Sequence, residues 1–450
     1  MLFGLVLIVI QQSGLAQDDF FNTIDVDIAA SDSSQGKNYS VIGWLTQKVS
    51  QGIERPDSLF SRQDRELNKI ETSLFAQLDM NLDQDSGFRI SAKVFHDEIY
   101  RLNDSIDYSS DERNEFRNRL ELRDFYIEKQ YDNGLYFKLG NQIIAWGMAE
   151  YSRVTDLINT ADQYTFAQQD LEDLRRQVPA ALLSYTVGEW TLDGVITHRA
   201  GRNYTAPAGD EFDPFIGLRQ AAITLERDRP RDEKEYFLRA STHLSQGDLQ
   251  LVAGEFNENT LSLNQIVTAG ATEPLFRYGQ NRMRAIGVSA NWADGSWLYF
   301  GELGLHKDKA VIPNASSVFR QVGGWDQKDQ VLSVLGAEYN GFRNLILTFE
   351  LDNTRTKNHS DFMYADKNQT SFGARAYWTA LNEKLKVVAV MNELSNDSGQ
   401  VSRLSVDYNF SDALEVGLLW VDYGSKLDSI FYNYRNNDIL QLHLRYNFQI

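Results

Sequence analysis

Cysteine is absent from the 450-residue sequence, which excludes disulfide bonds, thiolate metal sites and cysteine nucleophiles. Proline is scarce, with 7 residues against 30 glycines, and aromatic residues make up 12% of the chain. This composition is typical of many strands and turns rather than of helical bundles. Basic residues are in the minority, because 44 of them stand against 63 acidic residues for a net charge of −19. A nucleic-acid partner is therefore not expected, since its phosphates would repel the chain.

Long apolar runs are missing as well. After residue 20 no stretch is long enough to cross a bilayer as a helix, so membrane insertion would have to use strands. Residues 1–10 are almost wholly apolar, and Gly14 and Ala16 are small, so residues 1–16 are expected to be a signal peptide with the mature chain starting at Gln17. No Lys or Arg precedes Lys37, which leaves open a translation start further upstream, or a buried N-terminal strand or helix instead. The polar, acidic residues 17–37 are expected to form a periplasmic tail or a small plug.

From about residue 38, apolar and polar residues alternate with a period of two, which is the pattern of strands with one apolar face. In residues 72–82 the alternate positions include Leu74, Ala76 and Leu78. After the turn at residues 83–87, Phe88 and Ile90 continue the apolar face, so the two segments are predicted to form a hairpin. The same alternation recurs along the chain to residue 450.

The connections between these strands alternate in length. Tight turns are predicted near residues 132–134, 188–189, 246–247, 294–295, 340–341 and 411–412, and long polar connections lie between them. This is the plan of an outer-membrane barrel, with short periplasmic turns and long extracellular loops. We expect an all-β, antiparallel transmembrane barrel over residues 38–450, with about 18 strands, in the outer membrane of a Gram-negative bacterium. A soluble propeller or sandwich is the alternative, but no blade-like repeat is present.

The C-terminal segment alternates without a break and resembles the insertion signal that the barrel-assembly machinery reads. Its outward residues are expected to include Leu444, Tyr446, Phe448 and Ile450, although such signals usually end in phenylalanine. Outer-membrane lipids and the assembly machinery are the partners implied. Aromatic residues near strand ends are expected in interfacial girdles, and they are Trp44, Tyr126, Trp190, Trp292, Trp297, Trp378, Trp420 and Tyr446.

Three stretches carry a family resemblance: residues 120–128 read LELRDFYIE, residues 139–147 read LGNQIIAWG and residues 154–162 read VTDLINTAD. They resemble a proteobacterial family of outer-membrane barrels that is catalogued as a domain of unknown function and is similar to alginate-export-type porins. One departure is Thr160, where the family tends to have proline. Members are often encoded beside an RND-type, MMPL-like exporter and a periplasmic lipid carrier. The resemblance therefore implies a conduit for lipids or hydrophobic compounds.

A barrel of about 18 strands is too wide for its own side chains to fill. Its polar face is therefore predicted to line the pore, and the residues are mostly basic: Arg89, Lys93, Arg117, Arg119, Glu121, Arg123, Lys138, Gln142, Arg239, Arg375, Lys386, Arg403, His443 and Arg445. Such a lumen would favour anionic solutes. The alternative is that these residues pair with carboxylates across strands and brace the wall.

The long connection at residues 147–178 is the best candidate for an internal constriction. Thr160 and Gln163 match a capping box, and Tyr164, Ala167 and Leu171 recur at helical spacing, so a short amphipathic helix is expected over residues 161–175. The sequence leaves open whether this segment folds into the barrel or packs on the outer loops. The residues expected at the constriction are Trp146, Asp156, Asn159, Asp162, Asp170, Glu172, Asp173, Arg175 and Arg176.

Catalysis is not expected. The six histidines are scattered without recognisable partner spacing, and no nucleotide-binding glycine loop or metal-ligand spacing is found, so neither a cofactor nor a metal is expected. Calcium binding by the acidic loops stays open. The leading hypothesis is an outer-membrane channel or conduit that works with an RND-type exporter to move lipids. The alternatives are a porin for small anionic solutes and a non-conducting surface or assembly barrel.

Overall fold

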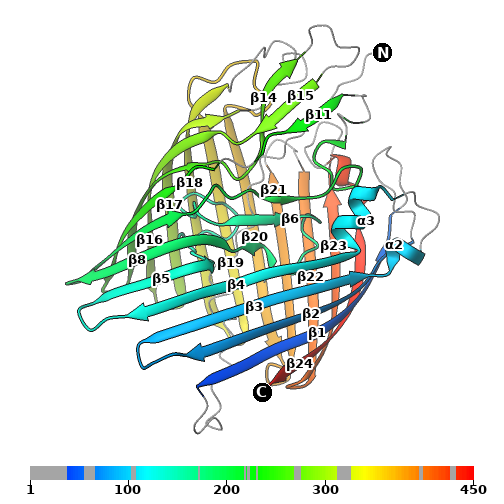
Figure 1. Cartoon of the computed structure of the whole chain (residues 1–450), viewed down its shortest axis with the longest axis horizontal. Coiled ribbons are helices and arrows are strands. Elements are labelled where there is room, and N and C mark those ends of the chain that lie inside the picture. Colours follow the sequence, from blue (N-terminus) through cyan, green and yellow to red (C-terminus); the bar gives the residue numbers. More distant parts are fainter. Residues whose placement is uncertain are drawn as a thin grey trace.

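Eighteen antiparallel strands form one continuous sheet in the computed structural model. The structure describes residues 38–54, 66–102, 108–170, 173–216, 219, 223–229, 232–267, 275–311, 326–394, 399–425 and 432–450. The sheet closes because its last strand, β24 (Ile439–Gln449), pairs with its first, β1 (Tyr39–Gly52). Figure 1 shows the resulting barrel. The predicted fold class and strand number are confirmed. The predicted signal peptide, residues 1–16, and the segment 17–37 lie outside the described residues.

Each strand of the wall pairs with its neighbours along the chain. The strands between β1 and β24 are β2 (Leu67–Asn81), β3 (Ser86–Asp97), β4 (Asn118–Gln130), β5 (Leu135–Gln142), β8 (Val178–Val187), β9 (Trp190–Thr197), β12 (Tyr236–Leu244), β13 (Gly247–Asn257), β16 (Arg282–Asp294), β17 (Trp297–Ala310), β18 (Gln327–Phe342), β19 (Leu345–Thr356), β20 (Asn368–Ala380), β21 (Leu385–Leu394), β22 (Gly399–Ser411) and β23 (Leu414–Gly424).

Smaller elements lie in the long connections. One small sheet contains β6 (Thr160–Gln163), β7 (Arg175–Arg176) and β10 (Tyr204–Thr205), and another contains β11 (Thr224–Arg227), β14 (Ser262–Val267) and β15 (Leu275–Gly279). The helical elements are α2 (Ile99–Leu102), α3 (Ser110–Phe116) and the 3-10 turn η3 (Tyr432–Tyr434). Within the described ranges, no helix combines the length and the apolar character needed to cross a membrane.

Tight turns gather at one end of the barrel, as predicted. Gly134 (φ 82°) and Gly295 (φ 59°) adopt left-handed conformations between β4 and β5 and between β16 and β17, where a side chain would be strained. The start of β1 lies at the same end, because Tyr39 pairs with Met80 beside the β2–β3 turn. The end of β24 lies there too, since Gln449 pairs with Ile42. The long connections are therefore at the opposite end, where Figure 1 shows α2, α3 and β11.

The burial pattern is that of a membrane barrel rather than of a soluble sandwich. Large apolar side chains on the outer face are exposed, including Leu120 (73%) and Leu335 (70%). Charged side chains on the inner face are buried, including Lys93 (2%) and Glu350 (1%). A soluble protein would place the apolar face inside, whereas a barrel in a bilayer turns it toward lipid. The chain is thus built for the outer membrane.

The aromatic girdle is predicted correctly at some positions only. Trp190, Trp292, Trp297, Trp378 and Tyr446 are exposed on the outer face. The prediction is wrong for Tyr126 and Trp44, which face the lumen. Tyr126 is buried beneath the ammonium of Lys138, and Trp44 stacks on Phe75 with Arg445 beside it. Both tyrosine and tryptophan suit either site, because their rings also attract cations.

The predicted C-terminal signal faces outward in β24. Leu444, Tyr446 and Ile450 are exposed, and Phe448 packs across the closure of the barrel over Gly43. A side chain at Gly43 would occupy the space of the phenylalanine ring. Recognition of this strand by the assembly machinery stays a prediction.

The helix predicted over residues 161–175 is wrong for the described part of that segment. Residues 160–163 form β6, which pairs with β7 and with β10, and residues 164–170 follow as turns. Ala167 has a φ of 63°, which no right-handed helix permits. Tertiary partners override the local pattern here, because the side chains of Asp170 and Asp173 reach cations of the barrel wall.

Replacing an outward leucine with a charge should test the orientation of the wall. Leu335→Arg at the middle of β18 is expected to lower the free energy of unfolding in lipid vesicles by about 2–4 kcal/mol, because the guanidinium would face hydrocarbon. Leu335→Ala is the control for loss of apolar contact, and urea titration of both variants measures the difference. Equal stability of the two variants would contradict a lipid-facing Leu335.

Candidate functional site

Residues 143–177 connect β5 to β8 and fold inside the barrel; we call them the lumen loop, and the structure describes all of them but 171 and 172. Apolar residues of its first part pack on the inner wall. Trp146 and Ile158 contact residues of β8, β9, β12, β13 and β16, among them Phe237. Phe166 packs against β22 and β23 in a separate cluster. Of the two placements left open by the sequence, the structure has the loop within the lumen.

Two carboxylates of the wall hold the first half of the loop. Glu302 of β17 accepts hydrogen bonds from the backbone N–H groups of Met148 (2.5 Å), Ala149 (2.9 Å) and Thr155 (3.0 Å), and from the hydroxyl of Thr155 (2.7 Å). Glu350 of β19 accepts from the next two N–H groups of the loop, at 2.5 and 3.1 Å. These donors compensate the burial of both carboxylates, so the wall and the loop depend on each other.

An ion pair adds to this attachment. Arg375 of β20 contacts the carboxylate of Glu150 at 2.5 Å, and both side chains are buried. Beside it, the ring of Tyr151 lies against Gly373, where a side chain would take the same space. The first half of the loop therefore lies closely against β17 to β20.

The second half of the loop is bound to the opposite part of the wall by ion pairs in which the loop supplies the carboxylates and the wall supplies the cations. Asp170 contacts Lys48 of β1 at 2.6 Å, and Asp173 contacts Lys93 of β3 at 2.7 Å and Arg123 of β4 at 2.9 Å. Arg123 continues the inward face of Arg119 and Glu121, and a bulge opposite Ser91 turns Asp124 to the same side. The loop thus crosses the lumen from β17–β20 to β1–β4.

The ionisation of these aspartates follows from their partners. Burial alone would raise the pKa of Asp170, but the ammonium groups of Lys48 and Lys93 outweigh it and hold the pKa well below its usual range. Burial likewise opposes the ionised form of Asp173, and Arg123 and Lys93 hold its pKa below the usual value. Both carboxylates are therefore charged at neutral pH.

A second network binds the loop to β4. Glu121 lies between the guanidinium groups of Arg119, Arg123 and Arg176, and Arg176 also contacts Asp162 at 2.7 Å. The expected constriction residues Asp162 and Arg176 therefore meet the expected pore-lining residues Arg119, Glu121 and Arg123.

The remaining loop residues pair with one another. Asp156 contacts Arg153 at 2.7 Å and Arg175 at 3.1 Å, and burial raises the pKa of Asp156 against the effect of Arg153. Burial also lowers the pKa of Arg175 to about 10. The side-chain amide of Asn159 accepts from the N–H of Ile144 and donates to the carbonyl of Arg176, both at 2.9 Å. These contacts fix the shape of the loop.

Other predicted pore residues lie apart from this network. Lys138 covers Tyr126, and Arg89 pairs with Asp79. Arg239 pairs with Asp193, Gln142 donates to a backbone carbonyl of β8, and Arg403 donates to the carbonyl of Gln169 in the loop. Arg445 lies beside Trp44, and Arg117 follows the end of α3. Lys386 is in register with Asp407, and His443 lies near Asp407 and Glu415. Glu172 lies outside the described residues. Many of the basic side chains therefore bind carboxylates, as the bracing alternative expected.

A cavity of about 790 Å³ lies on the side of the loop that faces the long connections; we call it the vestibule. It is lined by parts of α3, the lumen loop, the start of β8, β10 and β11. Four arginines from the connection between β9 and β12 and from β11 line it, together with only two carboxylates, Asp111 and Glu115. The arginines are Arg199, Arg202, Arg219 and Arg227.

Not all of this positive charge is neutralised. Arg219 contacts Asp213 at 2.6 Å, and the guanidinium of Arg227 lies over Phe215. Neither Arg199 nor Arg202 has an ion-pair or hydrogen-bond partner in the part of the chain that the structure describes. Sequence reasoning missed all four, because the connection has no periodicity. The recurrence of arginine through residues 199–227 was the feature of the sequence that could have indicated a basic site there.

A smaller cavity of about 210 Å³ lies between the loop and the wall formed by β16 to β20. Its charged lining includes Arg153, Asp156, Lys309 and Asp352. Asn203 lines both this cavity and the vestibule. The two cavities are therefore neighbours along the side of the loop.

Comparison with known proteins identifies the family of this chain. Residues 57–448 match the family described as "Protein of unknown function (DUF1302)". The expected resemblance to a family of unknown function is confirmed, while the likeness to alginate-export-type porins and the gene neighbourhood stay predictions. No curated protein matches the sequence.

Solved outer-membrane proteins share the fold. OpdK of Pseudomonas aeruginosa has a TM-score of 0.52 at 10% identity, covering 92% of this chain and 99% of that chain. OccAB3 of Acinetobacter baumannii has a TM-score of 0.53 at 9% identity, covering 92% and 100%. OccAB1 of the same species has a TM-score of 0.53 at 7% identity, covering 93% and 99%. At such low identity the likeness extends to the fold alone.

Detaching the second half of the loop should open the lumen. Asp170→Asn combined with Asp173→Asn removes the loop carboxylates from buried Lys48 and Lys93, and breaking a buried pair in this way costs about 3–5 kcal/mol. Single-channel conductance in a planar bilayer is expected to rise. Asp83→Asn, which removes an exposed pair with Lys129 at a turn, is the control and should leave conductance unchanged. Unchanged conductance in the double variant would contradict the attachment.

The same ion pairs predict a pH dependence. Because the folded-state pKa values of Asp170 and Asp173 are depressed, their contribution is present above the usual value of 3.8 and is lost as the pH falls below it. Conductance should therefore stay constant from neutral pH down to about 4 and rise below it. The double variant should lack this step, and a step between pH 5 and 7 would assign the change to other groups.

Proposed function

The chain belongs to the DUF1302 family, and we propose that it is an outer-membrane channel for small anionic solutes, above all carboxylates. The observation that carries the proposal is the vestibule, whose arginines lie directly above the lumen loop. The predicted lining of the whole wall with free basic residues is not part of it, since many of those residues hold the loop.

The vestibule concentrates positive charge in a chain whose net charge is −19. Guanidinium groups bind carboxylates through paired hydrogen bonds, and a cleft lined by one sign of charge raises the local concentration of counter-ions. Arg199 and Arg202 are therefore suited to receive an anion arriving from the side of the long connections.

Aromatic residues beside the arginines suit a ring. Tyr164 and Tyr204 line the vestibule, and the hydroxyl of Tyr164 donates to Glu115, which fixes the ring. OpdK of Pseudomonas aeruginosa has been solved with vanillate, at a TM-score of 0.50 and 10% identity, over 92% of this chain and 98% of that chain. Vanillate is an aromatic carboxylate, and this chemistry fits the combination of arginine and tyrosine in the vestibule.

The route onward would follow the side of the loop. A solute leaving the vestibule would pass Asn203, which also lines the cavity between the loop and β16–β20. Lys309 there pairs with Glu258 at 3.2 Å, and both side chains line this cavity. The loop would thus act as a selective constriction rather than as a complete plug.

The conduit hypothesis, with an RND-type exporter and a periplasmic lipid carrier as partners, remains a second proposal that rests on the family resemblance alone. Bilayer recordings separate the hypotheses. Ion currents that small carboxylates block support the porin. Silence with lipid co-purified in the lumen supports the conduit, and silence without lipid supports a non-conducting barrel.

Replacing Arg199 and Arg202 tests the site. Arg199→Gln combined with Arg202→Gln should lower the permeability ratio of anions to cations roughly fivefold, the factor for about 1 kcal/mol of lost attraction at 4 Å in water. Block by benzoate should weaken as well. The control is Arg284→Gln, since Arg284 is exposed at the same end of the barrel but pairs with Asp308. An unchanged ratio in the double variant would remove the vestibule from the selectivity.

A further inference from the structure

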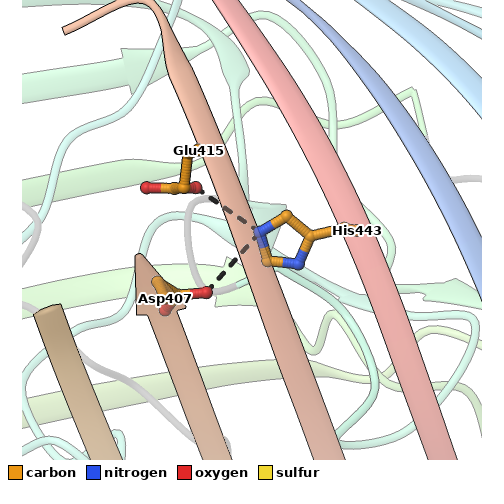
Figure 2. A group of neighbouring side chains, drawn as sticks. All are labelled: Asp407, Glu415 and His443. Atoms are coloured by element: carbon orange, nitrogen blue, oxygen red, sulfur yellow. Dashed lines mark hydrogen bonds and ion pairs between the residues drawn. The ribbon is translucent and has the colours of Figure 1, made fainter. Parts of the chain in front are cut away.

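Three side chains that can ligate a metal converge on the lumen wall outside the vestibule and the loop attachments. Asp407 of β22, Glu415 of β23 and His443 of β24 each offer one ligand atom, and these atoms lie within 4.8 Å of one another. Figure 2 shows both carboxylates directed at the same ring nitrogen of His443, Nε2. Because the residues come from three strands, their spacing along the chain gave no indication of a site.

The distances within this group are longer than those of the other histidine–carboxylate pairs in the chain. His443 Nε2 lies 3.5 Å from Asp407 Oδ1 and 3.4 Å from Glu415 Oε1. Two other histidines of the same chain meet carboxylates at 2.9 Å (His96) and 2.5 Å (His243). Ligand atoms around a tetrahedral ion with bonds of 2.0–2.2 Å are separated by about 3.4 Å. The two separations at His443 match this value, and all three ligand atoms lie within 4.8 Å of one another.

The carboxylates also lack other direct partners. In the described part of the chain, Asp407 accepts no hydrogen bond, and Glu415 has only the long contact with His443. Lys386 lies across from Asp407 in register but forms no ion pair with it. One imidazole N–H cannot satisfy two carboxylates. Both carboxylates therefore keep oxygen lone pairs that an ion entering from the lumen can use.

The backbone makes room for this arrangement. Gly417 lies between Asp407 and His443 in the register of β22, β23 and β24. A Cβ there would clash with the ring of His443 and with the carboxylate of Asp407. The three side chains keep 14–21% of their surface exposed, so an ion and its remaining water ligand can reach them from the lumen.

We propose that Asp407, Glu415 and His443 form a binding site for one divalent transition-metal ion, best suited to Zn²⁺. Imidazole nitrogen with carboxylate oxygen is a ligand set that zinc accepts. Three protein ligands leave one position for water or for a solute carboxylate. The ion would link the last three strands of the barrel, next to the pairing of β24 with β1. Arg445, in register with Glu415, opposes the ion by its charge and limits the affinity.

Titration of the full-length protein in detergent tests this site. The protein, freed of metal with a chelator and carrying no histidine tag, is titrated with ZnCl₂ by calorimetry, and one saturable equivalent is expected. His443→Ala and Glu415→Gln should each weaken binding by more than about 100-fold. His243→Ala, which removes a histidine already hydrogen-bonded to Asp248, is the matched control and should bind like the wild type.

Cobalt gives a second readout that does not depend on stability. Co²⁺ in the site should show the intense visible absorption of low-coordinate cobalt, and this should vanish in Asp407→Asn, whose side chain keeps the same shape. Absence of saturable Zn²⁺ binding in the wild type would overturn the proposal. Binding that His443→Ala leaves unchanged would overturn it as well, because the ion would then be held elsewhere.

Discussion

The carboxylate of Glu302 is the contact on which the interior of this barrel depends. It is buried at the wall and needs donors, and the irregular backbone of the lumen loop carries N–H groups that need acceptors. Four hydrogen bonds satisfy both requirements at once. Because the same loop forms one side of the vestibule, the position of the vestibule follows from this contact and from its counterpart at Glu350.

Charge has two roles in this lumen, and the partner of each residue decides which role it has. Lys48 and Lys93 are neutralised by aspartates of the loop, so they give the wall rigidity rather than selectivity. Arg199 and Arg202 have the same sign of charge but meet no carboxylate among the described residues. A count of basic residues on the inner face therefore overestimates the positive charge that is left without a carboxylate partner among the described residues, and Arg199 and Arg202 place part of that charge at the vestibule.

The strands could be predicted from the sequence because lipid and lumen impose a period of two on every segment of the wall. The same local reasoning failed at residues 161–175, where the helical spacing of Tyr164 and Ala167 was outweighed by contacts with distant strands. The pairs Asp170–Lys48 and Glu302–Met148 join residues more than a hundred positions apart, and no pattern within a segment indicates them. The cluster of Asp407, Glu415 and His443 was missed for the same reason.

The barrel wall and the filling of its lumen place different demands on the sequence of this chain. At 7–10% identity, the solved outer-membrane proteins retain the barrel over more than nine-tenths of the chain, because alternation can be kept with almost any apolar residue outside and any polar residue inside. The vestibule and the loop attachments have no such tolerance, since Gly373 must leave space for Tyr151 and Glu302 must meet its four donors. Two barrels with the same strand plan can therefore take different solutes, and the differences that matter lie in the residues that fill and line the lumen.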